Sequence, residues 1–405
     1  MCSAGLLPPR PHPWHAKTME YVIFGATLLG VALFHHRALH VALAGLAAVV
    51  VLQLASGPNL GLAAQEVLEH LADEWVILTN LLLLLLGFAV LSNQFEQSGL
   101  PETIPSWLPI GWVGGVVLLG LVFLLSIFLD NIAGAIIGGV AARHVFPREV
   151  TVGFLAAITA AANAGGAGSV LGDTTTTMMW ISGVSPLEVL PAFIGALVAF
   201  AVFAPFAAIA QQKTSPMVQV DLGNVVIDWM RVAVVVFILA MLVSVNVIAN
   251  SSFPQHEELA PVLGLGLWTA ILLSAPLRSP AWSSARQALY GSLFLVVLVA
   301  LASLMPLESL PEPSTVTTFG LGVLSAVFDN IPLTALAINQ GGYDWALLAY
   351  AVGFGGSMVW FGSSAGVALT NLFPKGRSLF AWIREGWFIP LSFIAGFMAM
   401  VATSV

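Results

Sequence analysis

Residues 125–132 read Leu-Ser-Ile-Phe-Leu-Asp-Asn-Ile, and residues 324–331 read Leu-Ser-Ala-Val-Phe-Asp-Asn-Ile. The two stretches share a Ser-x3-Asp-Asn core at a spacing of 199 residues, measured from Asp130 to Asp329. Each is followed by a second related stretch at a spacing of 190: Gly165-Gly166 with Gly172-Asp173-Thr174, and Gly355-Gly356 with Gly362-Ser363-Ser364. Two motifs that recur in the same order indicate an internal duplication.

The composition indicates a chain whose solvent is largely lipid. Of 405 residues, 59% are hydrophobic and only 8% are charged, and the mean hydropathy is +0.96. A soluble domain carries about three times that charge density, so an ordinary cytosolic protein is excluded. Twelve basic residues and a net charge of −8 argue against nucleic-acid binding. The single cysteine, Cys2, forms no internal disulfide, and no Cys/His cluster offers a zinc site.

Apolar runs that approach the roughly 30 Å hydrocarbon core of a bilayer recur along the chain. We expect ten full spans, at Thr18–Phe34, Ala38–Ala55, Trp75–Leu91, Val150–Ile181, Leu187–Ala210, Trp229–Ile248, Leu259–Leu277, Arg286–Met305, Trp345–Phe373 and Trp382–Ala402. Two further apolar segments, Trp112–Val145 and Thr317–Ile338, carry an aspartate near the middle. The arms of the second would measure about 18 and 12 Å at 1.5 Å per residue, too short to cross. Both segments are therefore predicted to be re-entrant hairpins with protein or water around the tip.

The basic residues test this topology, because cytoplasmic loops collect Lys and Arg. One side of the predicted membrane holds ten of the twelve: Arg37, Arg143, Arg148, Lys213, Arg231, Arg278, Arg286, Lys375, Arg377 and Arg384. We expect this side to be cytoplasmic and both termini to be extracytoplasmic, in a bacterial inner membrane, since no Arg- and Ser-rich transit segment is present. The first segment could be a cleaved signal sequence, although no small-residue cleavage pattern follows Phe34.

Each half of the chain is expected to hold three spans, a hairpin, a glycine-interrupted span and a last span. Five crossings per half force the halves into opposite orientations, which is the inverted-repeat plan of secondary transporters. The predicted divisions are an extracytoplasmic tail at 1–19, a first inverted repeat at 20–211, a cytoplasmic linker at 212–228 and a second inverted repeat at 229–405.

Three acidic residues lie at membrane depth, Asp130, Asp173 and Asp329, with no Lys, Arg or His beside them. Carboxylates in lipid are costly, so such residues are functional candidates that face a cavity. The alternative for each is a protonated aspartate that only hydrogen-bonds a neighbouring helix. All three lie next to a predicted helix break, which favours function.

The glycine-rich run that ends in Asp173 predicts a cation site. Glycines let a helix unwind and free its carbonyl oxygens, and the threonines after Asp173 add hydroxyls, so a small cation such as Na+ finds hard oxygen ligands. The matching loop supplies Ser363 and Ser364 without an acid. Candidates of second rank in the same segments are Ser126, Ser325, Asn163, Ser169 and Ser357.

If a proton and a metal ion compete for one carboxylate, binding of one releases the other. A protein that opens this site to each side of the membrane in turn would then exchange the two ions without further machinery. No separate proton relay is needed, because all eight His lie in the tail or near predicted span ends.

The paired Ser-x3-Asp-Asn tips and the run Gly-Asp-Thr-Thr-Thr-Thr-Met-Met-Trp at 172–180 resemble NhaD-type Na+/H+ antiporters. These belong to the ion transporter superfamily, which includes arsenite permeases and the dicarboxylate and citrate transporters. In the carboxylate transporters the tips look like Ser-Asn-Thr, whereas this chain has Asp130-Asn131-Ile132 and Asp329-Asn330-Ile331. The resemblance implies a homodimer with a scaffold part and a transport part that slides as an elevator.

The first hypothesis is a Na+ or Li+/H+ antiporter without a cofactor, which is not an enzyme. Asp173 would carry the ion and the proton, Asp130 and Asp329 would line or share the site, and a metal ion would contact Asp173, Asp329 and Thr174. Asn131 and Asn330 would fix the tips and offer carbonyl ligands, and the hydroxyl ligands would come from Thr174, Thr175, Ser363 and Ser364.

Other classes of function remain as alternatives to the antiporter. The second hypothesis is an anion, arsenite-like or carboxylate permease of the same fold, coupled to Na+ or H+. An intramembrane aspartyl protease would need two aspartates that share a proton, but the repeat places each at its own helix break. No Gly-x4-Gly-Lys-Ser/Thr phosphate loop supports an ATP-driven pump. A passive channel is disfavoured by the duplicated helix breaks.

Overall fold

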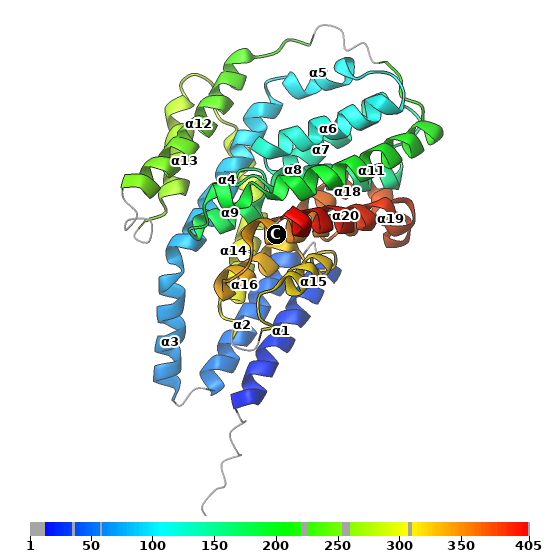
Figure 1. Ribbon diagram of the computed structural model, residues 1–405. Coiled ribbons are helices and arrows are strands. Elements are labelled where there is room, and N and C mark those ends of the chain that lie inside the picture. Colours follow the sequence, from blue (N-terminus) through cyan, green and yellow to red (C-terminus); the bar gives the residue numbers. More distant parts are fainter. Residues whose placement is uncertain are drawn as a thin grey trace, which may run out of the picture.

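The computed structural model describes residues 13–34, 37–56, 59–219, 225–252, 260–306 and 310–403, and the regular elements in these ranges are all helices (Figure 1). The predicted all-helical class is confirmed. Cys2, most of the expected tail, residues 220–224 of the expected linker and the acidic residues Glu257, Glu258 and Glu308 lie outside the described ranges.

A first group of helices comprises α1 (Pro13–Leu33), α2 (Ala38–Ser56), α3 (Leu60–Asp73), α4 (Trp75–Glu96), α5 (Leu100–Trp107), α12 (Trp229–Ser252), α13 (Val262–Ser274) and α14 (Trp282–Ser303). The pair α1 and α2 and the helix α3 run side by side in Figure 1. Helix α14 packs on both α2 and α4, and α12 and α13 also pack on α4. The contact of α13 with α4 is polar as well as apolar, because the N–H of Gly264 donates to Asn80 Oδ1 at 2.9 Å.

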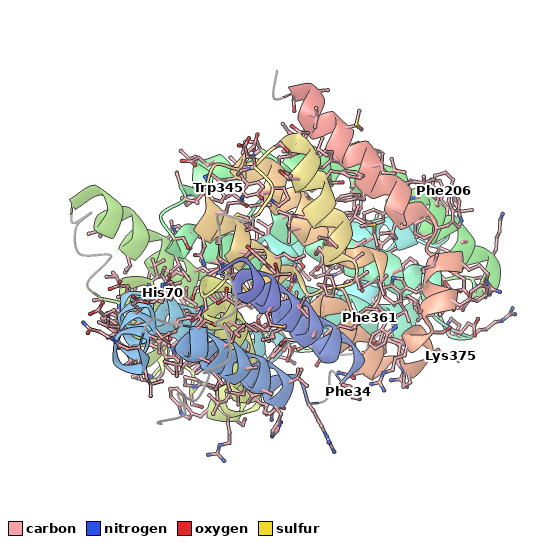
Figure 2. The ribbon with its side chains drawn as sticks, turned by 90° about the horizontal axis from the view of Figure 1, so that it is seen from below. Phe34, His70, Phe206, Trp345, Phe361 and Lys375 are labelled. Carbon is pink, nitrogen blue, oxygen red and sulfur yellow. The ribbon has the colours of Figure 1, made fainter. Side chains whose placement is uncertain are left out.

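A second group carries the predicted tips and breaks: α6 (Trp112–Phe128), α7 (Asn131–Val145), α8 (Val152–Ala167), α9 (Thr174–Ile181), α10 (Pro186–Val189), α11 (Ala192–Thr214), α15 (Thr315–Ser325), α16 (Asn330–Gln340), α17 (Trp345–Gly355), η4 (Gly356–Met358), α18 (Ser364–Leu372), η5 (Pro374–Arg377), α19 (Leu379–Glu385) and α20 (Phe388–Thr403). In Figure 2 the side chains of Phe206 and Lys375, from this group, lie across the molecule from His70 of α3.

Helix α8 forms the centre of the second group, and all of its residues are buried. Glycine and alanine make up most of α8, so its neighbours approach its backbone closely. Helix α17 is its counterpart in the sequence repeat and is buried from Ala346 to Gly355. The packing partners correspond too, since α6 lies against α8 and α15 lies against α17.

The helices are more interrupted than the ten predicted full spans. Within the described ranges, four helical segments are long and apolar enough to cross a membrane alone: Ala38–Ser56, Trp75–Glu96, Pro186–Thr214 and Trp282–Ser303. Several predicted spans are shorter apolar helices, such as Val262–Ser274. The predicted span Trp382–Ala402 is broken after Glu385, where α19 and α20 meet at a bend of 60°. A small glycine, Gly386, stands at this bend.

A polar cluster ties the segment before α12 to the end of α4. The carboxylate of Asp228 accepts two hydrogen bonds from Arg278, from Nε at 2.7 Å and from Nη2 at 3.1 Å. The N–H of Asp228 donates to the carbonyl oxygen of Ser98 at 2.8 Å. Because Arg278 stabilises the ionised form, the pKa of Asp228 lies below its usual value.

Asp228→Asn is expected to lower the melting temperature at neutral pH and to have less effect in acid. A carboxylate whose pKa is depressed in the folded state contributes its stability above the unfolded value of about 3.9. That contribution is lost as the pH falls through the lower folded-state pKa. Thermal unfolding in detergent between pH 7 and pH 2 measures the difference from wild type, with the exposed Glu188→Gln as control. A difference that stays constant with pH would show that the ion pair is not its source.

Candidate functional site

The first helix break lies between α8 and α9 and places Asp173 at the start of a helix. The backbone at Asp173 is extended, and its Oδ1 accepts a hydrogen bond from the N–H of Thr175 at 3.2 Å. The hydroxyls of Thr176 and Thr177 turn back to the carbonyl oxygen of Asp173, at 2.9 Å each. This break was predicted from the glycine run, and it leaves the carboxyl group buried, with 2% of the residue exposed.

The second break lies between η4 and α18 and has the same form. Ser363 occupies the position that corresponds to Asp173 and caps α18, where its hydroxyl accepts from the N–H of Gly366 at 3.3 Å. Ser364 follows as the counterpart of Thr174. The two breaks therefore share a backbone plan but differ in charge, since the second holds a hydroxyl where the first holds a carboxylate.

The two Asp-Asn tips also interrupt helices, between α6 and α7 and between α15 and α16. Helices α6 and α7 fold back on each other, because Gly134 lies against Ser126 and Gly138 lies against Val122. Asp329 caps α16 through the N–H of Ile331 at 3.1 Å. Asp130 holds the corresponding cap position of α7.

Glycine lets each break approach a hairpin tip closely. A Cβ atom at Gly172 would overlap the carbonyl oxygen of Ser126, the last-turn residue of α6. A Cβ atom at Gly362 would lie 2.6 Å from the carbonyl oxygen of Ala326, beyond the end of α15. The tip and the break of each half are thus in direct backbone contact.

Asn163 of α8 joins the first tip to the second break. Its Oδ1 accepts from Asn131 Nδ2 at 3.1 Å, and its Nδ2 donates to Ser357 Oγ at 2.9 Å and to Ser363 Oγ at 3.1 Å. Asn163 is fully buried. A buried amide with three side-chain partners fixes their relative positions, because breaking any of these bonds leaves a polar group unpaired.

The counterpart of Asn163 at the repeat spacing of 190 residues is Gly353 of α17, and it lies beside Asp173. A Cβ atom at Gly353 would stand 3.2 Å from Asp173 Oδ2. Within the described residues this Oδ2 atom, Thr175 Oγ1 and Ser126 Oγ are buried without a hydrogen-bond partner. Unpaired buried oxygens are costly, so a proton or a cation at Asp173 would remove a penalty that the chain otherwise bears.

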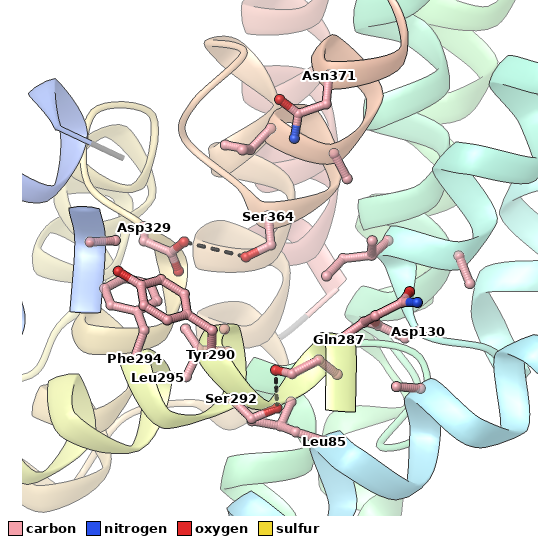
Figure 3. Close-up of a pocket in the computed structure, with 18 of the residues that line it drawn as sticks. Leu85, Asp130, Gln287, Tyr290, Ser292, Phe294, Leu295, Asp329, Ser364 and Asn371 are labelled. Carbon is pink, nitrogen blue, oxygen red and sulfur yellow. Dashed lines mark hydrogen bonds between the residues drawn. The ribbon is translucent and has the colours of Figure 1, made fainter. Parts of the chain in front are cut away.

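Two cavities border the aspartates. A small one of about 10 Å³, the size of one water molecule, is lined by Asp130, Asp173, Thr174 and Thr177 together with apolar side chains. A large one of about 490 Å³ is lined by Asp130, Asp329 and Ser364 (Figure 3). In the large cavity Asp329 Oδ2 accepts a long hydrogen bond from Ser364 Oγ, at 3.5 Å. Asp130 borders both cavities and so lies between Asp173 and Asp329.

The large cavity extends to the side of the molecule that carries basic residues. Ala38, Gln287 and Asn371 line it there; the first two follow Arg37 and Arg286 in the sequence, and Asn371 accepts a hydrogen bond from Arg377. A third carboxylate, Glu96 at the end of α4, also lines it. Among the described residues that line the two cavities there is no Lys, Arg or His. The electrostatic field in such a cavity attracts cations and repels anions.

No family model matches the chain. Sodium/proton antiporter 1 of Arabidopsis thaliana is 29% identical over 309 residues, which are 64% of this chain and half of the plant protein's length. Na(+)/H(+) antiporter NhaD of Vibrio parahaemolyticus is 28% identical over 371 residues, 76% of this chain and 85% of that protein. Na(+)/H(+) antiporter NhaD of Alkalimonas amylolytica is 25% identical over 379 residues, 80% of this chain and 76% of that protein.

The chain resembles NhaD-type antiporters. The resemblance predicted from the motifs is confirmed, and with the apolar helices it supports an integral membrane protein of ion-transport type. The NhaD-type relatives are transporters and not enzymes. The residue roles predicted for this chain stay predictions.

The structure brings together some of the predicted site residues and separates others. Asp130, Asp173 and Thr174 share the small cavity, whereas Asp329 and Ser364 lie on the large one. Among the described residues no three acidic, His or Cys side chains are close enough to hold a metal ion jointly. Ser169 and Ser325 donate to backbone carbonyl oxygens, of Ile127 at 2.5 Å and of Val352 at 2.7 Å.

Sequence reasoning missed several groups of this candidate site. Gly353 can be recognised from the sequence as the counterpart of Asn163 only by applying the 190-residue spacing. Its place beside Asp173 follows from the structure alone. Glu96, Gln287 and Asn371 lie at helix ends, where polar residues usually face water. Their place on the cavity depends on long-range packing, for which no local signal exists.

Proposed function

We propose that the protein exchanges Na+ or Li+ for H+ across a membrane by alternating access. The observation that carries this proposal is the buried, unpaired oxygen of Asp173, beside a small cavity that Asp130 also lines and that has no basic side chain among its described lining residues. The printed names of the relatives, which are sodium/proton antiporters, support the same activity.

Asp173 would bind either the proton or the cation. In the cation-bound form, Asp130 and Thr174 would add oxygen ligands from the wall that they share with Asp173, and Thr175 Oγ1 would do so from the same helix start. Asp329 and Ser364 would hold the ion on its way through the large cavity. Asn131 and Asn330 would keep the tips in place, and the same carboxylate would serve proton and ion in turn.

The proposal also includes the two inverted repeats and the movement of the second helix group. The contacts of Gly172 and Gly362 correspond, as do the pairs α6–α8 and α15–α17. These correspondences support two inverted repeats, 20–211 and 229–405, joined by a linker at 212–228, each with a re-entrant hairpin. We further propose an elevator-type motion of the second helix group in a homodimer within a bacterial inner membrane, with both termini outside.

Proton movement across the vesicle membrane tests the activity. The purified protein is reconstituted into proteoliposomes with a pH-sensitive dye, and NaCl, LiCl, KCl and a panel of anions including arsenite are added in turn. Proton movement that depends on Na+ or Li+ is the expected result. Transport of arsenite or of an organic anion, without a cation response, would support the permease of the same fold and exclude the antiporter.

The side on which the large cavity opens can be tested with single cysteines in a Cys2→Ser background. Ala288→Cys on the cavity wall is expected to react with a membrane-impermeant thiol reagent added on the same side as Lys375→Cys. It should not react from the side on which Glu188→Cys reacts. Labelling of Ala288→Cys only together with Glu188→Cys would place the opening on the opposite side and contradict the proposed topology.

A further inference from the structure

The short helix α19 presents an apolar face away from the protein. Leu379, Phe380 and Ile383 are exposed on it, with Phe380 73% exposed, and the exposed Trp387 follows just beyond the end of the helix. On the opposite face Trp382 is buried, with 1% of the residue exposed. Since α19 turns away from α20 by 60°, it does not continue the apolar helix that follows. A helix with these two faces, bent away from its neighbour, suits the surface of a bilayer.

Basic residues surround this apolar face. Lys375, Arg377 and Arg384 come from η5 and α19 themselves. Arg148 lies just before the N-terminal end of α8, and Lys213 lies at the C-terminal end of α11. These ends are held together, because Thr151 N and Oγ1 both donate to Gln211 Oε1 at 2.8 Å. We call the five residues the basic rim.

The basic rim is only partly neutralised by carboxylates. Lys375 pairs with Glu149 at 3.1 Å, and Arg384 pairs with the neighbouring Glu385 at 3.2 Å. Arg148, Lys213 and Arg377 make no ion pair with any carboxylate in the described ranges. A net positive rim around exposed Phe, Ile and Trp side chains matches the headgroup region of an anionic leaflet.

The buried face of α19 reaches the candidate ion site. Trp382 Nε1 donates to the carbonyl oxygen of Ser357 at 3.2 Å. The hydroxyl of the same Ser357 accepts from Asn163, which also holds Ser363 and Asn131. The side chain of Trp382 thus links α19 directly to the second helix break.

We propose that the basic rim and the apolar face of α19 bind the headgroups and upper acyl chains of anionic phospholipids, and that Trp382 couples this binding to the helix break at Ser357. The positive charge of the basic rim selects anionic lipids, and the exposed aromatic residues set how deeply α19 lies in the bilayer surface. Bound lipid holds α19 against the bilayer surface and so orders the loop from Gly355 to Gly366. The proposal rests on the protein lying in a membrane and does not depend on which ion it transports.

Amide hydrogen exchange of the full chain in nanodiscs tests the coupling without a transport assay. Exchange in the loop 355–366 is expected to be slower in phosphatidylglycerol-containing discs than in pure phosphatidylcholine discs. In Arg377→Gln/Arg384→Gln this difference should disappear, and retention of phosphatidylglycerol on the purified protein should fall, by about fivefold for each basic residue removed at low ionic strength. The matched control, Arg37→Gln/Arg286→Gln, removes two exposed basic residues that do not belong to the basic rim and should behave as wild type.

Trp382→Phe separates binding from coupling, since it keeps an aromatic side chain on the buried face and removes the hydrogen bond to Ser357. It should retain anionic lipid as wild type does, while its loop exchange no longer responds to lipid. Equal exchange of the wild-type loop in both lipids would overturn the coupling. Unchanged retention in the double Arg variant would overturn the lipid site. A change in oligomeric mass with unchanged retention would assign the surface to contacts between subunits instead.

Discussion

Asp173→Asn is expected to abolish sodium-dependent proton movement while the protein stays folded. An asparagine Oδ1 can still accept the hydrogen bond from Thr175, so the start of α9 is preserved. The amide can neither take up a proton nor carry the negative charge that a cation requires. Removing an unpaired carboxylate from a buried place also removes a desolvation cost, so the melting temperature should not fall.

The measurement combines the proteoliposome dye assay with thermal unfolding in detergent. Glu188→Gln serves as the control, because it removes a carboxylate from an exposed position. It should transport as wild type does. Wild-type rates in Asp173→Asn would remove this residue from the mechanism, whereas a fall in melting temperature would show that the variant reports on folding.

Gly172→Ala is expected to cause the second large loss, through sterics alone. The added methyl group overlaps the carbonyl oxygen of Ser126, so either the break or the first hairpin tip must shift. Such overpacking costs about 1–3 kcal/mol and here displaces the backbone next to Asp173. We expect a lower melting temperature and a severe loss of transport. Gly362→Ala, which places its methyl 2.6 Å from the carbonyl oxygen of Ala326, should act in the same way on the second half.

Gly320→Ala provides a matched control for both glycine variants. Gly320 lies in α15, and a Cβ atom there meets nothing within 4 Å. Alanine is the better helix former by up to about 1 kcal/mol, so this variant should be as stable as wild type or more so. If Gly172→Ala matched Gly320→Ala in stability and transport, the contact between tip and break would have no functional weight.

Local features of the sequence predict the helix breaks and the burial of Asp173. Glycine runs interrupt α8 before α9 and α17 before α18, and an acidic residue without a basic neighbour marks each tip. The sequence does not reveal that Asn163 contacts Ser357, because the partners are 194 residues apart and the bond depends on how α8 meets the second break. The bend between α19 and α20 was missed because the apolar residues on both sides of Arg384, Glu385 and Gly386 dominate the average over a span-length window. Hydropathy averages are insensitive to a change of direction.

Only some of the predicted full spans are single helices long enough to cross a membrane, for a related reason. A window of apolar residues measures how much chain is compatible with lipid, but α8 and α17 are apolar because protein surrounds them on every side. Their alanine and glycine content reflects close packing against α6 and α15. Composition therefore predicts burial correctly here and does not show where the helices at α8 and α17 end.

The two copies of the repeated motif differ at one contact. In one copy Asn163 bonds to Ser363, and in the other Gly353 lies beside Asp173 without a bond. Where both members are neutral, the contact would stay the same before and after an ion passes in the proposed transport, and it would hold α8 to the second helix break. Where one member is glycine, the carboxylate is left free to change its charge state. A substitution at Asn163 would thus impair transport although Asn163 is not an ion ligand. A measurement of ion binding, separate from the transport rate, would distinguish the loss of these hydrogen bonds from the loss of a ligand.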